Sequence, residues 1–251
     1  MQWLDVQLVE KQQWSDRHFS LRFRAPGFTF KAGQFVRIGL LQDDGEVLAR
    51  PYSLVNAPGS ELLEIYFNIV PEGPLSPQLA ALEPGAPLKL APRAAGFLTI
   101  DEVPVEHTGC RHLWMLATGT GVGPFLSILQ SAESWRRFDK LLLVYSVRYQ
   151  QELAYSNLID QLTQQHANRF HFVPAVTREI VPGALTTRIT SALESGELEQ
   201  HAGLTISPQQ SHVMMCGNSA MIRSAFSLLE QRGLKKHLRR EPGHISTEKY
   251  H

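Results

Sequence analysis

The sequence predicts two domains: an antiparallel β-barrel or β-sandwich, followed by an α/β domain with a parallel sheet. The chain has 251 residues, which is enough for two domains of ordinary size. Residues 1–100 carry short strand-like runs separated by glycine and proline, which is typical of antiparallel sheets. Beyond the polar stretch at 101–110, apolar runs alternate with helix-like segments, which indicates a parallel sheet. We therefore expect the domain boundary near that stretch.

In the first part, strands are expected where short runs alternate in hydrophobicity or are rich in β-branched residues. These runs are 6–9, 19–23, 34–40, 52–55, 62–70 and 88–90. A short helix is expected over 76–82, with Ser76 as its N-cap and Pro77 at its first position.

In the second part, the expected strands are dense apolar runs and the expected helices have amphipathic spacing. The strands are 111–117, 141–146, 170–177 and 212–216, and the helices are 125–133, 151–165 and 219–232.

Composition excludes several classes of function. Lys and Arg total 24, as do Asp and Glu, so no net charge favours a nucleic-acid partner. Cys110 and Cys216 are too few for a four-cysteine zinc or iron–sulfur site, so we expect no metal. Two cysteines also fit a reducing compartment. Neither a signal-peptide pattern nor an apolar run of about 20 residues is found, so we expect a cytoplasmic protein without a membrane segment.

A glycine-rich turn, A-T-G-T-G-V-G-P at 117–124, separates an expected strand from an expected helix. Glycines there let the backbone approach a ligand, and the helix N-terminus offers free N–H groups to a pyrophosphate. The spacing differs from G-x-G-x-x-G, and a tight turn without a ligand is the alternative reading. A later strand ends in Cys216-Gly217-Asn218, where small residues suit a planar ring, although buried cysteines are more often plain hydrophobes.

Three arginines, Arg148, Arg178 and Arg188, lie in loops of the second part, and the first two directly follow expected strands. Open α/β sheets bind ligands at that edge, and guanidinium groups fork onto phosphate oxygens. Together they favour a doubly charged 2′-phosphate, although a solvated loop residue is the better reading of any one of them alone.

In the first part, R-P-Y-S-L-V-N-A-P at 50–58 carries unusual chemistry for a strand. Alternation puts Arg50 and Tyr52 on one face, with Ser53 on the other or donating from its backbone. The turn at 71–79 leads to a possible helix N-terminus suited to phosphate. A barrel tyrosine is usually packing alone. The tail at 244–251 lacks periodicity, but its two final rings suggest docking onto something flat.

Taken together, these pieces resemble the ferredoxin–NADP reductase family, particularly the bacterial ferredoxin/flavodoxin–NADP reductases. The resemblance spans nearly the whole chain. It rests on R-P-Y-S at 50–53, E-I-Y-F-N-I-V-P-E-G-P-L-S at 64–76, A-T-G-T-G-V-G-P-F-L-S at 117–127, the three arginines, M-C-G-N at 215–218 and the aromatic tail. It implies a six-stranded antiparallel barrel holding FAD at 1–104. A domain with a five-stranded parallel sheet, holding NADP(H), would follow at 105–251, and its tail, 244–251, would return to the flavin.

The resemblance also implies a role for each matching residue. Arg50 would pair with the FAD pyrophosphate, Tyr52 would pack on the isoalloxazine ring, and Ser53 would approach flavin N5. The remaining FAD residues would be Pro51, Tyr66, Asn68, Val70, Gly73, Leu75, Ser76, Tyr250 and His251. The NADP residues would be Thr118, Gly119, Gly121, Arg148, Arg178, Arg188, Cys216, Gly217 and Asn218. The catalytic set would be Ser53, Tyr52, Cys216, Glu248 and Tyr250.

The tail departs from the family pattern. Relatives of this subtype commonly end in Tyr-Trp, with the indole against the FAD adenine, whereas this chain ends in Tyr250-His251. Tyr250 would keep its place by the flavin, and His251 would replace an indole with a smaller, titratable ring.

The activity implied is hydride transfer from NADPH to FAD, followed by single-electron transfer to ferredoxin or flavodoxin. An acidic carrier of this kind would need a local basic surface, for which 234–240 and Arg93 are candidates, and the alternative reading of 234–240 is a solvated helix end. We expect a monomer. Two alternatives remain open: a stand-alone NAD(P)H-dependent flavin reductase serving an oxygenase or another acceptor, and a flavin- and nucleotide-binding regulatory subunit.

Overall fold

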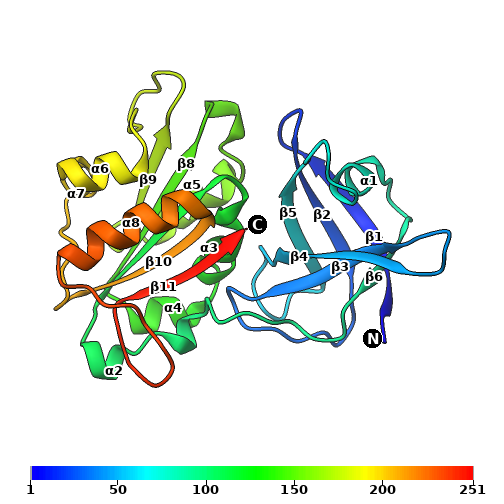
Figure 1. The fold of residues 1–251 in the computed structure, drawn as a ribbon, viewed down its shortest axis with the longest axis horizontal. Helices are drawn as coiled ribbons and strands as arrows, with labels where there is room; N and C mark the ends of the chain where they lie inside the picture. The colour runs from blue at the N-terminus through cyan, green and yellow to red at the C-terminus, as the bar shows by residue number, and fades with distance from the viewer. Residues whose placement is uncertain (1, 251) are drawn as a thin grey trace.

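The structure, a computed structural model, describes the backbone of residues 2–250 and the side chains of residues 2–249. Its strands form two sheets, one of six strands and one of five. Figure 1 shows the two sheets in separate domains that lie side by side, with the end of the last strand at the junction between them. The predicted fold class is confirmed, and the two sheets meet where the candidate site is built.

The first sheet is an antiparallel barrel in the order β4-β3-β6-β1-β2-β5. Its strands are β1 (Leu4–Gln13), β2 (His18–Arg24), β3 (Phe35–Leu41), β4 (Val47–Ser53), β5 (Leu62–Asn68) and β6 (Pro87–Leu90). The barrel closes just beyond β4, where Leu54 bridges Ile65 and the Val55 N–H donates to the Glu64 carbonyl at 2.9 Å. Alternate residues of each strand fill its apolar core.

The short helix α1 (Ser76–Ala81) follows β5 as expected, but Ser76 is not its N-cap. The cap position is Leu75, and no side chain caps the helix. The Ser76 hydroxyl instead accepts a hydrogen bond from the Val70 N–H at 2.9 Å, which fastens the turn at 70–76. The cap prediction was wrong because the serine serves the preceding turn instead of the helix.

The second sheet is parallel and has the order β11-β10-β7-β8-β9. Its strands are β7 (His112–Thr118), β8 (Lys140–Val147), β9 (Phe170–Val176), β10 (Ser211–Asn218) and β11 (Ile245–Tyr250). The chain reverses its direction across the sheet between β7 and β10, and open α/β sheets bind ligands at the carboxyl ends of the strands beside such a point.

Helices cover both faces of the parallel sheet (Figure 1). Met115 and Leu143 belong to the apolar core that includes residues of α3 and α5, whereas Trp114 and Val144 belong to the core beneath α6, α7 and α8. The α-helices here are α2 (Val105–Thr108), α3 (Gly123–Leu129), α4 (Ala132–Arg137), α5 (Ser156–Gln165), α6 (Ile189–Ser195), α7 (Glu197–Ala202) and α8 (Ser219–Gln231). Three short 3-10 helices are η1 (Ile100–Glu102), η2 (Gly119–Val122) and η3 (Gln150–Glu152).

Several of these elements differ from the prediction. The helix expected over 125–133 is split into α3 and α4, and the one expected over 151–165 is split into η3 and α5 at Tyr155, whose φ is 62°. Helices α6 and α7 were not predicted, because their apolar positions lie in short, polar-rich stretches. None of the described helices is long and apolar enough to cross a membrane.

The tail is a strand of the sheet, which its missing periodicity did not predict. Residues 245–250 pair with 213–218 in parallel register, and Cys216 lies opposite Glu248. An edge strand has one neighbour only and its side chains face different surroundings on each face, so a clean alternation is not required. The pairing holds the end of the chain at the domain junction.

The segment after β6 joins the two domains and packs against the second one. Leu98, Ile100 and Val103 are part of the same apolar core as α3. The Ser127 hydroxyl donates to the Asn56 carbonyl at 2.7 Å, and the Gln130 amide donates to the Val55 carbonyl at 2.8 Å. These contacts tie helix α3 to the corner where the barrel closes.

Candidate functional site

A cavity of about 690 Å³ lies at the domain junction. The barrel contributes residues of β3, β4, β5 and the 70–76 turn, and the second domain contributes Thr120, Glu248 and Lys249. Its size is within the usual range for small-molecule and cofactor sites. Its lining residues are Phe35, Arg50, Pro51, Tyr52, Ser53, Tyr66, Phe67, Asn68, Val70, Gly73, Pro74, Leu75, Ser76, Thr120, Glu248 and Lys249.

Ten of the twelve residues predicted for FAD line this cavity. The other two are Tyr250, of which only the backbone is described, and His251, which lies outside the described residues. Sequence reasoning missed Phe35, Phe67, Pro74, Thr120 and Lys249 as lining residues. Phe67 and Pro74 lie inside the quoted 64–76 motif, so their position next to predicted residues was a usable signal. Phe35 carries no such signal, because its place depends on how β3 pairs with β4.

Residues 50–53 all line the cavity, which strict alternation along a strand does not predict. The reason is that β4 ends at Ser53 and the chain turns. Leu54 still donates to the Gln34 carbonyl beside β3, whereas Val55 already donates to Glu64 on β5. At this corner Ser53 comes to the same cavity as Arg50 and Tyr52, instead of facing away from them.

The wall around Tyr52 is aromatic. The Tyr52 ring meets Phe67 edge-on with centroids 5.8 Å apart, and burial raises the pKa of the Tyr52 hydroxyl to about 12. Arg50 is exposed and donates to the carbonyl of Ala49, its neighbour in the chain. The cavity therefore offers an aromatic wall next to a permanent cation.

A carboxyl group from the tail reaches the same cavity. The Ser53 hydroxyl lies 3.5 Å from a Glu248 carboxyl oxygen, although 195 positions separate the two residues in the chain. Burial raises the pKa of Glu248 to about 7, and the hydrogen bond from Ser53 opposes part of that rise. The group thus changes charge in the physiological range at a position facing the cavity.

The glycine-rich turn and the end of β10 meet at the switch point of the parallel sheet. The Asn218 N–H donates to the Thr118 hydroxyl at 2.8 Å, and the Asn218 side chain caps α8 by accepting from two backbone N–H groups. A Cβ on Gly121 would lie 2.5 Å from the Cys216 carbonyl oxygen, so only glycine lets the two segments approach this closely. The fully buried Cys216 and the turn are thereby in direct contact.

We predict that Gly217→Ala destabilises this junction by about 1–3 kcal/mol. Gly217 has a φ of 122°, and an added Cβ would lie 2.3 Å from the Thr118 hydroxyl and 2.6 Å from its carbonyl oxygen. Chemical denaturation measures the loss. The matched control is Gly183→Ala, because Gly183 also has a positive φ but nothing lies near an added Cβ. Equal losses in the two variants would contradict the role assigned to the close approach.

Two of the three predicted arginines lie side by side. Arg148 follows β8, Arg178 follows β9, and the Arg178 N–H donates to the Arg148 carbonyl at 2.9 Å. Both side chains are exposed at the carboxyl edge of the sheet. Arg188 is also exposed and immediately precedes α6, and no hydrogen bond links it to the other two within the described residues. The structure thus links Arg148 and Arg178 through their backbones, at the ends of neighbouring strands.

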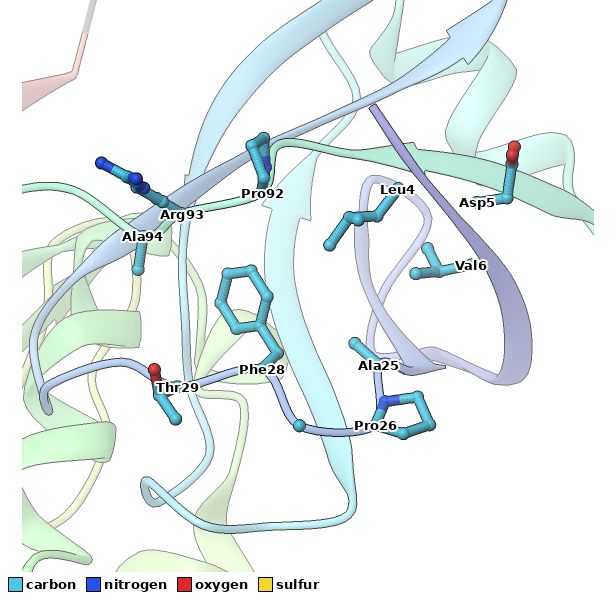
Figure 2. A pocket seen from close by; sticks show the side chains of 11 residues that line it. Leu4, Asp5, Val6, Ala25, Pro26, Phe28, Thr29, Pro92, Arg93 and Ala94 are labelled. Carbon is cyan, nitrogen blue, oxygen red and sulfur yellow. The ribbon is translucent and has the colours of Figure 1, made fainter. Parts of the chain in front are cut away.

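A second cavity of about 370 Å³ opens in the barrel between the start of β1, the 25–29 turn and residues 92–94. Figure 2 shows Phe28 at its centre, with Leu4, Pro26 and Pro92 around it and Arg93 pointing away to one side. It contains no residue predicted for FAD or NADP. Among the described residues, no group of three or more His, Cys, Asp or Glu side chains is arranged to hold a metal ion.

Comparison with known proteins places these features in context. Residues 115–226 match the oxidoreductase NAD-binding domain family. The chain is 46% identical to the flavodoxin/ferredoxin–NADP reductase of Escherichia coli over 249 residues, covering 99% of this chain and 98% of that one. It is 36% identical to a ferredoxin–NADP reductase of Pseudomonas aeruginosa, with coverages of 96% and 95%. A crystal structure of a ferredoxin NADP⁺ reductase from Neisseria gonorrhoeae, with bound FAD and NADP, superposes with a TM-score of 0.92 at 31% identity and covers 98% of both chains.

Proposed function

The chain belongs to the flavodoxin/ferredoxin–NADP reductase family, and from that membership we infer an oxidoreductase that moves electrons between NADP(H) and ferredoxin or flavodoxin through FAD. The observation that carries this function is the cavity at the domain junction, because ten residues predicted for FAD line it. When bound, FAD accepts two electrons as a hydride and releases them singly, which is the chemistry a nicotinamide and a one-electron carrier require.

The residues present fit FAD. Arg50 supplies a permanent cation for the pyrophosphate, and Tyr52 and Phe67 form an aromatic wall for a planar ring. We propose that Ser53 approaches the reactive edge, with Glu248 behind it at 3.5 Å. The turn that Ser76 fastens to Val70 would shape the remaining contact, together with Pro51, Tyr66, Asn68, Gly73 and Leu75. We also propose that Tyr250 covers the flavin and that His251 lies beyond it, although both side chains lie outside the described residues.

For NADP(H), we propose a site across the switch point of the parallel sheet. Thr118, Gly119, Gly121, Gly217 and Asn218 would form the backbone cradle on the nicotinamide side, with Cys216 beneath it. Arg148 and Arg178 would hold the 2′-phosphate, since their backbones are hydrogen-bonded at the edge of the sheet and two arginines suit a doubly charged anion. Arg188 would join them from the start of α6.

The catalytic set we propose is Tyr52, Ser53, Cys216, Glu248 and Tyr250. The register of the sheet favours the grouping, because Cys216 is paired with Glu248, and Glu248 reaches Ser53 across the domain junction. Chain residues would hold the two rings and exclude water, and Glu248 would hold or release a proton near pH 7.

We propose that the acidic carrier docks beside the cavity, on a surface around Phe97. Phe97 is 63% exposed, and the Arg239 guanidinium lies over its ring at 4.2 Å. The alternative reading of segment 234–240 as a solvated helix end was wrong, because α8 stops at Gln231. The segment forms a loop that is closed by backbone hydrogen bonds between Leu238 and Glu241. A cation beside an exposed ring is the kind of surface that speeds encounter with an acidic partner.

We further propose that the chain acts as a cytoplasmic monomer without a nucleic-acid partner. A net charge of zero gives no general attraction to nucleic acid. The chain has only two cysteines, Cys110 and Cys216, and both are buried, which suits a reducing compartment. We place the domain boundary between residues 104 and 105, which leaves all six barrel strands in the first domain and all five parallel strands in the second.

Anaerobic mixing of the FAD-loaded protein with NADPH tests the function. We expect NADPH to bleach the absorbance of the oxidised flavin at about 450 nm. When ferredoxin or flavodoxin is then added, we expect the carrier to become reduced. Raising the ionic strength should slow carrier reduction more than flavin bleaching, because salt screens the docking charges. A protein that binds FAD but is not bleached by NADPH would contradict the assignment.

A further inference from the structure

Tyr155 has a backbone conformation that is unusual for a residue with a large side chain. It lies between η3 and α5 with a φ of 62°, and it is the only described residue other than glycine with a positive φ. Bulky residues are rare in this left-handed region because Cβ crowds the following carbonyl. The side chain is nonetheless 5% exposed, so its contacts must offset the backbone strain.

Those contacts lie in the other domain. The Tyr155 hydroxyl donates to a carboxyl oxygen of Glu64 at 2.7 Å, and the second oxygen of Glu64 accepts from the Arg22 guanidinium at 2.9 Å. Glu64 is 6% exposed, and a buried carboxylate needs such partners to offset its lost hydration. A residue of the NADP domain thus completes the hydrogen bonding of a buried acid of the barrel.

Glu64 is itself fixed at the closure of the barrel. Its N–H donates to the Asn56 side chain at 2.7 Å, and its carbonyl accepts from the Val55 N–H at 2.9 Å. The strand that carries it, β5, also carries Tyr66 two residues later on the same face. The anchor and a wall of the cavity are therefore parts of one rigid strand.

Tyr155 also touches that wall directly. Its ring meets the Tyr66 ring edge-on with centroids 5.4 Å apart, and on another side it packs against Trp14 at 4.5 Å. Tyr66 lines the cavity proposed for FAD and is 4% exposed. The tyrosine of the second domain is thus wedged between a barrel loop and a wall of the flavin cavity.

We propose that Tyr155 is a positioning residue for hydride transfer, acting through Glu64 and Tyr66. The proposal rests on the proposed function. By binding Glu64 it holds the domain that carries the NADP(H) residues in one orientation against the strand that walls the flavin cavity. Hydride transfer depends steeply on the distance and alignment of the two reacting rings, so a looser domain contact slows that step without removing either binding site.

The first test is Tyr155→Phe in the FAD-loaded protein, which keeps the ring and removes only the hydroxyl. We expect the rate constant for flavin reduction at saturating NADPH to fall about tenfold, while FAD content and the NADPH dissociation constant change by less than about twofold. The control is Ser134→Ala, which also removes a buried hydroxyl but one bonded to the Ile128 carbonyl within the second domain. Its flavin-reduction rate should match that of the unchanged protein.

A second pair of variants tests the link to Glu64. A glutamine there keeps an oxygen that accepts from Tyr155, whereas a leucine keeps only the volume. Flavin-reduction rates should therefore rank the unchanged protein first, Glu64→Gln second and Glu64→Leu third. In the double variant Tyr155→Phe/Glu64→Leu, the two losses should not multiply, because they remove the same contact.

Three results overturn the inference. They are a Tyr155→Phe rate equal to that of Ser134→Ala, fully multiplicative losses in the double variant, and equal rates for the Gln and Leu variants. None of them touches the proposed function, which fails only if NADPH does not bleach the flavin of the unchanged protein. FAD content, measured for every variant, separates slower hydride transfer from failure to fold.

Discussion

Replacing both Arg148 and Arg178 by alanine is expected to lower kcat/KM for NADPH by about 10²–10³-fold and to leave kcat/KM for NADH nearly unchanged. Hydrogen bonds to charged groups contribute about 1.5–3 kcal/mol each, and every 1.4 kcal/mol is about a factor of ten. The two arginines are adjacent and exposed at the carboxyl edge of the sheet, where they can grip a phosphate that only NADPH carries. Steady-state reduction of ferricyanide with each nucleotide measures the ratio.

Arg136→Ala is the matched control, because Arg136 is an exposed arginine that pairs with Glu133 on α4, away from the carboxyl edge of the sheet. Arg188→Ala adds a finer comparison, since no hydrogen bond joins Arg188 to the other two in the described part of the chain. A double variant that loses NADH and NADPH activity equally would show that the arginines support the fold and not the 2′-phosphate.

Replacing Glu248 by glutamine is expected to make the FAD-free protein more stable than the unchanged protein at pH 8, by at most about 3 kcal/mol. Burial raises the pKa of Glu248 to about 7, from the ordinary value of 4.5 that the group has in the unfolded chain. The unfolded chain therefore releases this proton at lower pH than the folded protein does. The contribution of Glu248 to the free energy of unfolding is fully present below pH 4.5, and it is lost as the pH rises through about 7.

Urea unfolding of both proteins from pH 4 to pH 8 measures this difference. Glutamine mimics the protonated acid, so the two curves should meet at low pH and separate through the window below pH 7. Glu61→Gln, at an exposed position, is the control and should leave the pH dependence unchanged. In the FAD-loaded protein, the rate of flavin reduction should change with the charge of Glu248, and Glu248→Gln should lose that dependence. Parallel stability curves for Glu248→Gln and the unchanged protein would contradict the raised pKa.

The cavity itself was largely readable from local signals. Arg50, Tyr52 and Ser53 stand in one short motif, and the 70–76 turn is marked by glycine and proline, and residues of both stretches line the cavity. Glu248 was predicted only through the family resemblance, since nothing near it in the chain indicates a partner. Its contact with Ser53 joins positions 195 apart and depends on how β11 pairs with β10.

The residues proposed for NADP(H) were also predicted only in part from the sequence. The glycines at 119 and 121 and the arginines after the strands were visible as patterns, because the order of strands and helices fixes which ends meet at one edge. The hydrogen bond from the Arg178 N–H to the Arg148 carbonyl depends on the register in which β8 and β9 pair. Register is a property of paired strands and not of either strand alone.

By itself, the sequence determined the two-domain architecture, the family and most of the cavity wall. These depend on periodicity, turn residues and short motifs, which are properties of neighbouring residues. Only the tertiary structure decided that the tail is a fifth strand, that Ser76 fastens a turn instead of capping a helix, and that Tyr155 crosses to Glu64. Each of these depends on groups distant in the chain that meet only after both domains have packed, because a buried polar group binds whichever partner the fold brings within reach.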